Sequence, residues 1–210
     1  MLDYDLYIFD FDGTIFDTNK IKNDAFECVI KEVCPQRYLR RYMKKLNTYN
    51  EMTRRIKFDV LADVIEPECR YTFVEKCIKK YESIISESFM NAEFIPGAAN
   101  FLKKIKGKRK FIVSGGKESE IAALLKKHSL LGEFEAIYDG EKSKFDHFFM
   151  IKHKSPGAKR LSIGDSKLDY SSSIDHVNNF VFVQCASQEE NTSWFRDNNA
   201  ILINDFRELI

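Results

Sequence analysis

The hydrophobic residues of this chain gather in short runs that end in small polar turns. Residues 6–9 lead into Asp-Phe-Asp-Gly, residues 110–113 into Ser-Gly-Gly, and residues 159–163 into Gly-Asp-Ser. Residues 179–183 form a further run, rich in β-branched and aromatic side chains. Runs of this length and composition predict buried β-strands, with residues 136–138 as a weaker candidate.

Helical patterns separate these runs. A helical stretch from residue 118 to about residue 128 follows the second run, and strands that alternate with helices are typical of a parallel sheet covered by helices. Between residue 15 and about residue 94 the chain is instead rich in lysine and glutamate at helical spacing, without a convincing strand, until Ile-Pro-Gly ends the block. The pattern therefore predicts an α/β protein with an inserted helical block.

We expect a Rossmann-like three-layer parallel sheet core made of residues 1–15 and 95–210, and an inserted all-helical cap domain of residues 16–94. Because the insertion follows the first polar turn directly, we expect it to lie over the active end of the sheet as a lid on two linkers. At 210 residues, 44% hydrophobic and 31% charged, the composition is that of a globular protein able to bury a core.

The charge balance of the chain limits the classes of partner that we expect it to bind. The 33 basic and 32 acidic side chains leave a formal net charge of +1, which argues against a nucleic acid or an anionic membrane as partner. The segment 36–45 interleaves bases with aromatic residues, but a solvated helix with buried tyrosines is the favoured interpretation. No apolar stretch approaches the roughly 20 residues that cross a bilayer. The oligomeric state stays open.

The five cysteines are scattered, odd in number and without a CxxC pair, which disfavours both a disulfide framework and a zinc site and favours a cytoplasmic location. The acidic Asp3 and Asp5 do not suit a secretory signal. The four histidines have no metal-ligand spacing, and their lysine neighbours predict surface positions. They are His128, His147, His153 and His176.

Asp10 and Asp12 carry the first candidate chemistry. In an extended strand they would point to opposite sides of Phe11, so the turn at Gly13 has to bring both carboxylates to one site. Two carboxylates suit covalent phosphoryl transfer, because one attacks phosphorus while the other protonates the leaving oxygen and later activates water. Such a pair requires a cation.

Asp165 and Asp169 are candidates for the remaining ligands of that cation. They are four residues apart and share a face if the chain turns helical after Asp165. Mg²⁺ prefers hard oxygen donors and is typically held by one or two carboxylates together with substrate phosphate, whereas Ca²⁺ suits so sparse a site less well. The sequence therefore predicts Mg²⁺ as cofactor.

Ser114, Gly115 and Gly116 end a predicted strand ahead of a helix. They offer a hydroxyl group and free backbone N–H groups at a positive helix N-terminus, which makes a cradle for phosphate. A lysine can add a point positive charge that balances nucleophile and phosphate. Lys144 is the first candidate for it, and Lys142 competes.

In order and location, these four motifs resemble the signature of the haloacid dehalogenase superfamily. The resemblance covers the whole sheet domain, and the insertion resembles the helical cap of the phosphoglycolate phosphatase and β-phosphoglucomutase branch. It implies a nucleophile at Asp10, a general acid and base at Asp12, phosphoryl ligands at Ser114 and the Gly115 N–H, and a charge-balancing Lys144. It also implies Mg²⁺ bound by the Asp10 carboxylate, the Asp12 backbone carbonyl and Asp165, with Asp169 binding directly or through water.

The resulting hypothesis is a Mg²⁺-dependent phosphatase that hydrolyses a small phosphomonoester, a phosphorylated metabolite, through an aspartyl-phosphate. Dehalogenase members of the family generally lack the second aspartate, so Asp12 favours phosphate chemistry. Two alternatives stay open: a phosphomutase of a sugar phosphate that uses the same residues, and a non-catalytic binding or sensor module. The presence of every expected catalytic residue counts against the latter.

Overall fold

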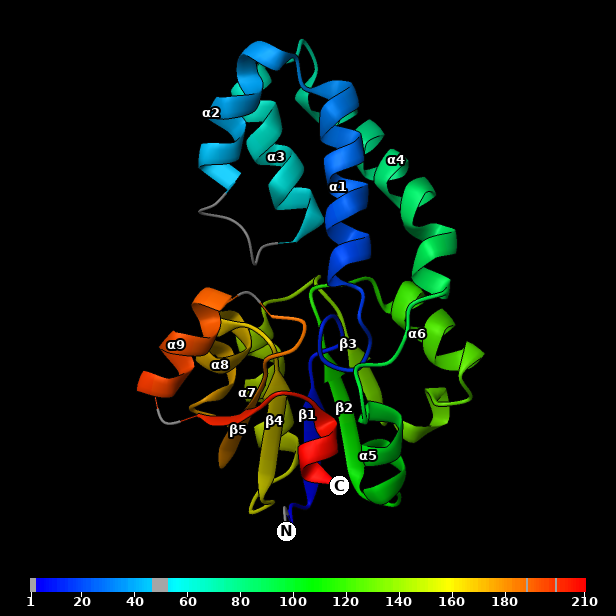
Figure 1. Cartoon of the computed structure of the whole chain (residues 1–210), viewed down its shortest axis with the longest axis vertical. Coiled ribbons are helices and arrows are strands. Elements are labelled where there is room, and N and C mark those ends of the chain that lie inside the picture. The colour runs from blue at the N-terminus through cyan, green and yellow to red at the C-terminus, as the bar shows by residue number, and fades with distance from the viewer. Residues whose placement is uncertain (1–2, 47–52, 188, 199) are drawn as a thin grey trace. The chain divides into compact units, whose positions relative to one another are not determined.

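The structure, a computed structural model, describes residues 3–46, 53–187, 189–198 and 200–210. The chain divides into two compact units, residues 1–19 with 92–210 and residues 20–91. The first unit contains the sheet and the second is helical (Figure 1). The helical unit falls inside the predicted cap of residues 16–94, and its action as a cap stays a prediction.

The described part of the sheet unit forms one parallel sheet in the order β3-β2-β1-β4-β5-β6. The strands are β1 (Leu6–Phe9), β2 (Arg109–Val113), β3 (Ala136–Tyr138), β4 (Arg160–Gly164), β5 (Asn179–Val183) and β6 (Ile201–Ile203). The helices of this unit are α5 (Ala98–Lys104), α6 (Glu118–Lys127), α7 (Lys144–Lys154), α8 (Lys167–Ser173) and α9 (Glu189–Asp197), with 3-10 turns at Leu131–Glu133 and Phe206–Leu209. Every predicted strand is present, and β6 is an edge strand that the sequence pattern did not reveal.

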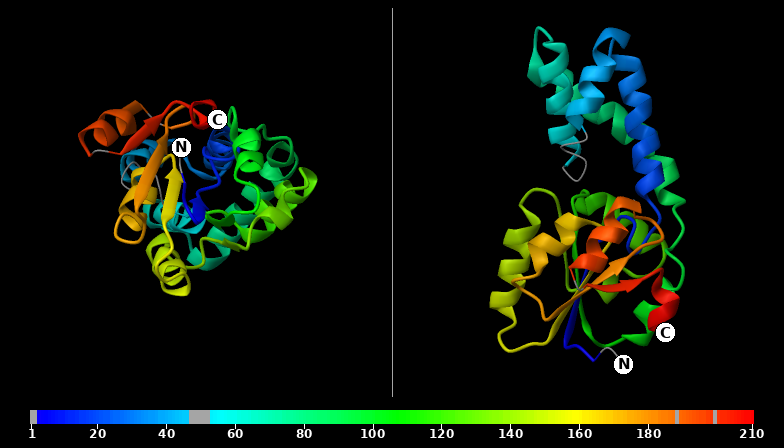
Figure 2. Two further views of the ribbon diagram at one scale, coloured as in Figure 1. Left: turned by 90° about the horizontal axis from the view of Figure 1, so that it is seen from below. Right: turned by 60° about the vertical axis from the view of Figure 1, so that its left-hand side comes forward.

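Helices cover both faces of the sheet (Figure 2). Successive strand residues point to opposite faces, and β1 is buried on both. Leu6 and Ile8 pack in a cluster with Phe148 of α7, whereas the rings of Tyr7 and Phe9 lie on the other face, 6.0 and 6.4 Å from that of Phe101 in α5. This confirms the predicted α/β architecture with three layers.

The helices described in the helical unit are α1 (Asn19–Val33), whose first residue still belongs to the sheet unit, α2 (Gln36–Leu46), α3 (Arg54–Ile65) and α4 (Arg70–Met90). Phe58 of α3 is fully buried and stacks on Phe26 of α1 at 4.7 Å. In α2, Tyr42 is buried while Arg40 and Arg41 are exposed, as expected for a solvated helix with a tyrosine in the core. Among the helices of the described ranges, none combines the length and apolar character needed to cross a membrane.

The expected surface position of the histidines is wrong for two of them. His147 is 5% exposed and His176 is 6% exposed. The His147 ring lies on the inner side of α7, stacked on Tyr138 at 5.0 Å, and the His176 ring meets Phe145 edge-on at 4.7 Å. Lysines beside a histidine in sequence point to other sides of the element, so they do not determine its burial.

The two connections to the helical unit pair with each other inside the sheet unit. Asp17 N donates to Glu93 O at 2.8 Å, and Ile95 N donates to Ile15 O at 3.0 Å. The rings of Phe16 and Phe94 stack at 4.3 Å between these bonds. This pairing anchors the far end of the loop that follows β1.

Candidate active site

The polar turns predicted from the sequence meet at the carboxyl edge of three neighbouring strands. Asp10 follows β1, Ser114 follows β2 and Asp165 follows β4, and β1 lies between β2 and β4. The chain leaves β1 for β2 on one side and later returns to β4 on the other, which makes this edge the topological switch point of the sheet. Open parallel sheets bind ligands in the crevice outside such a point.

A tight loop after β1 places the two aspartates. Asp10 N still donates to Ile163 O of β4 at 2.9 Å, so Asp10 continues the strand. The chain then turns so sharply that the backbone N–H groups of Ile15 and Phe16 both donate to Phe11 O, at 3.0 and 3.2 Å. Gly13 adopts φ 73°, a left-handed conformation that costs glycine little.

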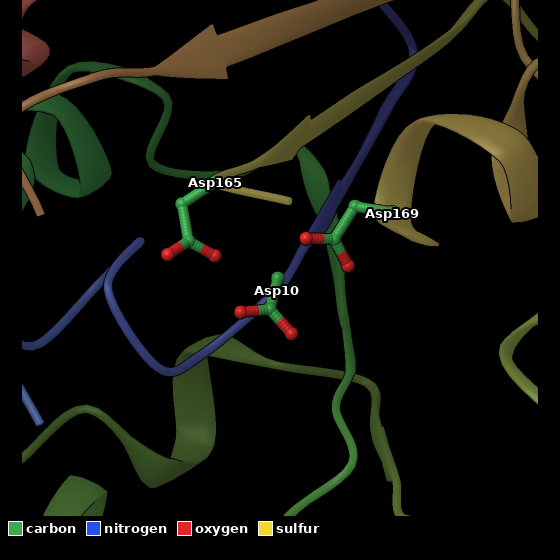
Figure 3. Close-up of side chains that lie close together, drawn as sticks. All are labelled: Asp10, Asp165 and Asp169. Atoms are coloured by element: carbon green, nitrogen blue, oxygen red, sulfur yellow. The ribbon is translucent and has the colours of Figure 1, made fainter. Parts of the chain in front are cut away.

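Asp10, Asp165 and Asp169 form a buried acidic cluster (Figure 3). Each offers a carboxylate oxygen, and these oxygens lie within 4.8 Å of one another. The three residues are only 7%, 8% and 2% exposed. Asp169 is fixed by a capping box at the start of α8, in which Ser166 Oγ accepts from Asp169 N and the Asp169 carboxylate accepts from Ser166 N.

Lys144, the first residue of α7, reaches this cluster. Its Nζ lies 2.6 Å from Asp10 Oδ1 and 2.5 Å from Asp169 Oδ1, and its side chain is 12% exposed. Lys142 is exposed. Of the two competing lysines, the fold therefore brings Lys144 to the candidate nucleophile.

The carboxylates of the acidic cluster outnumber the ammonium group beside it, and the pKa values of Asp10, Asp165 and Lys144 are shifted. Burial, reinforced by the nearby Asp169 carboxylate, raises the pKa of Asp10 to about 7, although Lys144 acts to lower it. Burial and the other two carboxylates also raise the pKa of Asp165 well above its ordinary value. Burial alone would lower the pKa of Lys144, but Asp10 and Asp169 hold it above that of an ordinary lysine. Both aspartates are thus shifted first by loss of hydration and then by repulsion between carboxylates, which one ammonium group does not offset.

A divalent cation fits this donor set. With all three carboxylates ionised, the cluster and the Lys144 ammonium group carry two net negative charges on buried side chains, and hard oxygen ligands suit a hard divalent ion. A bound cation would favour the ionised forms of Asp10 and Asp165, whose pKa values burial and mutual repulsion raise.

Asp12 and Ser114 stand beside the cluster. Ser114 is 1% exposed, and its Oγ accepts from Gly116 N at 3.0 Å and donates to Asp12 Oδ2 at 3.4 Å. Gly115 is exposed, and no described atom outside its chain neighbours lies within 4 Å of the place where a Cβ would stand. The Asp12 carboxylate therefore lies beside Ser114 of the predicted phosphate cradle, and Gly115 of the same cradle borders open space.

Two residues that the sequence pattern does not mark as site residues, Thr18 and Asn19, contact aspartates of the candidate site. Thr18 Oγ1 donates to Asp12 Oδ1 at 2.5 Å, and Asn19 Nδ2 donates to Asp165 Oδ2 at 2.8 Å. Asn19 and Asp165 are 146 positions apart. The only signal in the sequence is that two polar residues follow the first motif closely. Their hydrogen-bond partners depend on the tertiary fold.

Comparisons with known proteins point to one family. The sequence model described as haloacid dehalogenase-like hydrolase matches residues 7–183. No curated protein sequence matches the chain. Among solved structures, a predicted phosphoglycolate phosphatase from Haemophilus somnus is 17% identical with a TM-score of 0.76, over 100% of this chain and 97% of that one.

Two further solved structures share the fold. CbbY from Rhodobacter sphaeroides, in complex with phosphate, is 14% identical with a TM-score of 0.73, over 99% of this chain and 96% of that one. The HAD-type hydrolase YfnB from Bacillus subtilis, bound to magnesium, is 18% identical with a TM-score of 0.66, over 98% of this chain and 96% of that one.

Proposed function

Because the chain belongs to the haloacid dehalogenase-like hydrolases, we propose that it is a Mg²⁺-dependent phosphatase that hydrolyses a small phosphomonoester through an aspartyl-phosphate on Asp10. One observation carries this proposal: the Asp10 carboxylate stands at the carboxyl end of the central strand, against the Lys144 ammonium and beside two more buried carboxylates. The same placement is typical of a nucleophile that is held in a fixed orientation and supplied with positive charge.

In the first step an Asp10 carboxylate oxygen attacks phosphorus, and the bond between phosphorus and the ester oxygen breaks. Lys144 favours the ionised form of Asp10, which is the form that can act as a nucleophile. Ser114 Oγ and the Gly115 N–H would bind the phosphoryl oxygens, and the open space beside Gly115 supports this role.

Asp12 completes the proton transfers. It donates a proton to the departing ester oxygen, and in the second step it takes a proton from the water that attacks the aspartyl-phosphate. That attack releases inorganic phosphate and regenerates the Asp10 carboxylate. The hydrogen bond from Ser114 to Asp12 supports this role, because it puts the acid next to the group that would bind phosphate.

We propose Mg²⁺ as the cation, with the carboxylates of Asp10, Asp165 and Asp169 and the Asp12 backbone carbonyl as its protein ligands. When bound, it would neutralise charge on the nucleophile and on the transferred phosphoryl group. The three buried carboxylates support a divalent metal, and the magnesium in the related Bacillus subtilis structure supports the choice of ion.

We further propose that residues 16–94 act as a cap that selects the substrate, a small phosphorylated metabolite. The chain enters this segment directly from the loop that carries Asp12, so cap and catalytic loop are covalently continuous. A cytoplasmic location completes the proposal, and the five free cysteines support it.

A phosphatase screen tests the proposal. Phosphoglycolate, sugar phosphates and nucleotides are offered to the chain with Mg²⁺ and with EDTA, and both released phosphate and isomerised product are measured. We expect phosphate release that EDTA abolishes. An isomerised sugar phosphate in place of free phosphate would instead establish the mutase.

The Asp10→Asn variant tests the nucleophile. An amide does not attack phosphorus, so we expect turnover and the acid-trapped, hydroxylamine-sensitive phosphoryl-protein to disappear while the circular dichroism spectrum is retained. Asp175→Asn, at an exposed aspartate of the same unit, serves as the matched control. Near-native turnover by Asp10→Asn would contradict the assignment.

A further inference from the structure

Asn19 forms a bridge between the acidic cluster and the loop that follows β5. Its Nδ2 donates to Asp165 Oδ2 at 2.8 Å and to the backbone carbonyl of Ala186 at 3.2 Å. Both partners only accept hydrogen bonds when Asp165 is ionised, so the amide nitrogen, not the amide oxygen, has to face them. The chemistry of the partners thus fixes the orientation of the Asn19 side chain.

The packing around Gly13 shows how closely this bridge is fitted. A Cβ added to Gly13 would lie 2.2 Å from Asn19 Nδ2 and 2.3 Å from Asp165 Oδ2. The hydrogen bond between Asn19 and Asp165 therefore passes directly over the Gly13 Cα. Glycine is required there for the backbone conformation and also to leave room for this pair.

Asn19 serves the one carboxylate of the cluster that Lys144 does not pair with. The ion pairs of Lys144 are with Asp10 and Asp169. Within the described ranges, Asn19 is the side chain that donates a hydrogen bond to the Asp165 carboxylate. A neutral donor orients a carboxylate without adding a positive charge that would compete with a cation.

The backbone of Asp165 is held from the same loop. Ser187 Oγ donates to the Asp165 backbone carbonyl at 2.6 Å, and Asn191 Nδ2 donates to Ser187 Oγ at 3.1 Å. The main chain and the carboxylate of Asp165 are thus each tied to the segment after β5, the carboxylate through Asn19 and Ala186. This arrangement restricts the rotation of the Asp165 side chain.

We propose that Asn19 is a positioning residue for the metal centre: it holds Oδ2 of Asp165 so that the other carboxylate oxygen is presented to the cation. This inference rests on the proposed metal site. Hydrogen-bond partners of metal ligands fix ligand orientation, and their removal typically lowers metal affinity about 10- to 100-fold.

The test measures binding of Mn²⁺, as a paramagnetic probe, to the metal-free full-length chain by electron paramagnetic resonance. We expect the Kd for Mn²⁺ to rise about 10- to 100-fold in Asn19→Leu, which has the same branching but no donor, and in Asn19→Ala. Asn19→Gln keeps the amide and should recover part of the affinity. Asn23→Ala, at an exposed asparagine one turn along α1, is the matched control and should bind as the native chain does.

Two accompanying measurements separate positioning from a structural role. In EDTA the thermal midpoint of Asn19→Ala should stay near the native value, whereas the increase in midpoint caused by Mg²⁺ should shrink, because that increase depends on Kd. In a phosphatase assay the Mg²⁺ requirement should rise while kcat at saturating Mg²⁺ is largely kept. If Asn19→Leu does not fold, Asn19→Ala and Asn19→Gln carry the comparison.

Native Mn²⁺ affinity in Asn19→Leu and Asn19→Ala would overturn the inference and leave the proposed function intact. A fall of the midpoint in EDTA that matches the fall in Mg²⁺ would also overturn it, in favour of a structural role. If the native chain and Asp165→Asn bind Mn²⁺ alike, the proposed metal site itself fails and the inference with it.

Discussion

The Asp10 carboxylate is buried between one ammonium group and two other carboxylates. Loss of hydration and the charge of Asp169 disfavour its ionised form, while Lys144 favours it, and the balance puts its pKa at about 7. In the metal-free protein Asp10 therefore still binds a proton near neutral pH. The proposed nucleophile has to be ionised, so a cation bound at this site would also favour its reactive form.

The raised pKa of Asp10 predicts a pH dependence of stability in EDTA. Folded Asp10 keeps its proton up to pH about 7, whereas unfolded Asp10 loses it near 3.8, the ordinary pKa of an aspartate. Since the folded state binds more protons in this window, its stability falls as pH rises through it. Between pH 4.5 and pH 8 we expect this group to remove about 3 kcal/mol of unfolding free energy.

Urea unfolding of the native chain and of Asp10→Asn in EDTA, at several pH values, measures this contribution. The native chain should lose stability relative to the variant as pH rises, because the variant has no proton to lose at position 10. Parallel pH profiles for the two proteins would contradict the electrostatic account of the cluster.

At the scale of elements, the turn from β4 into α8 supplies two of the three clustered carboxylates. The helix α8 is only seven residues long, and its start is held by the reciprocal hydrogen bonds between Ser166 and Asp169. Ser166 Oγ also lies 2.7 Å from Asp169 Oδ2. The same side chain that caps the helix therefore also orients a candidate metal ligand.

Removing this cap should affect stability and metal binding together. We expect Ser166→Ala to lower the free energy of unfolding by about 1 kcal/mol, the usual cost of losing a serine N-cap, and to weaken Mg²⁺ binding. Urea unfolding and a Mg²⁺ titration measure the two effects. Ser171→Ala, at an exposed serine of the same helix, is the control, and equal behaviour of the two variants would sink the prediction.

At the scale of the whole molecule, each compact unit has a core of its own. In the helical unit, Phe26, Phe58 and Tyr81 form an aromatic cluster, with Phe58 at 4.7 Å from Phe26 and 6.3 Å from Tyr81. The clustered carboxylates and Lys144 all belong to the sheet unit. The proposed metal site should therefore depend on the sheet unit and much less on the helical core.

We expect Phe58→Ala to destabilise the helical unit by about 3–5 kcal/mol, since it removes a fully buried ring. Hydrogen exchange should then increase in residues 20–91 while β1, β2 and β4 stay protected and Mn²⁺ still binds. Ile56→Ala, at an exposed position of α3, should change exchange little. Loss of protection across the sheet would mean that the two units unfold as one.

The sequence by itself determined the parallel strands from residue 6 to residue 183, the helical insertion and the family. Buried parallel strands are continuous apolar runs, and the acidic and small residues that end them mark the catalytic edge; both signals are local in sequence. Strand β6 was not predicted, because three residues at the edge of a sheet show too little hydrophobic periodicity. The roles of Asp10, Asp12, Ser114, Lys144, Asp165 and Asp169 stay predictions until the experiments above are done.

Only the tertiary structure decided which side chains meet. Lys144, and not Lys142, reaches Asp10 because it stands at the start of α7. His147 and His176 are buried despite their polar neighbours in sequence. The fold also brought Asn19 to Asp165 across 146 positions. Contacts of this kind depend on how separate elements pack, and the local pattern of one segment carries no information about the partner that another segment will supply.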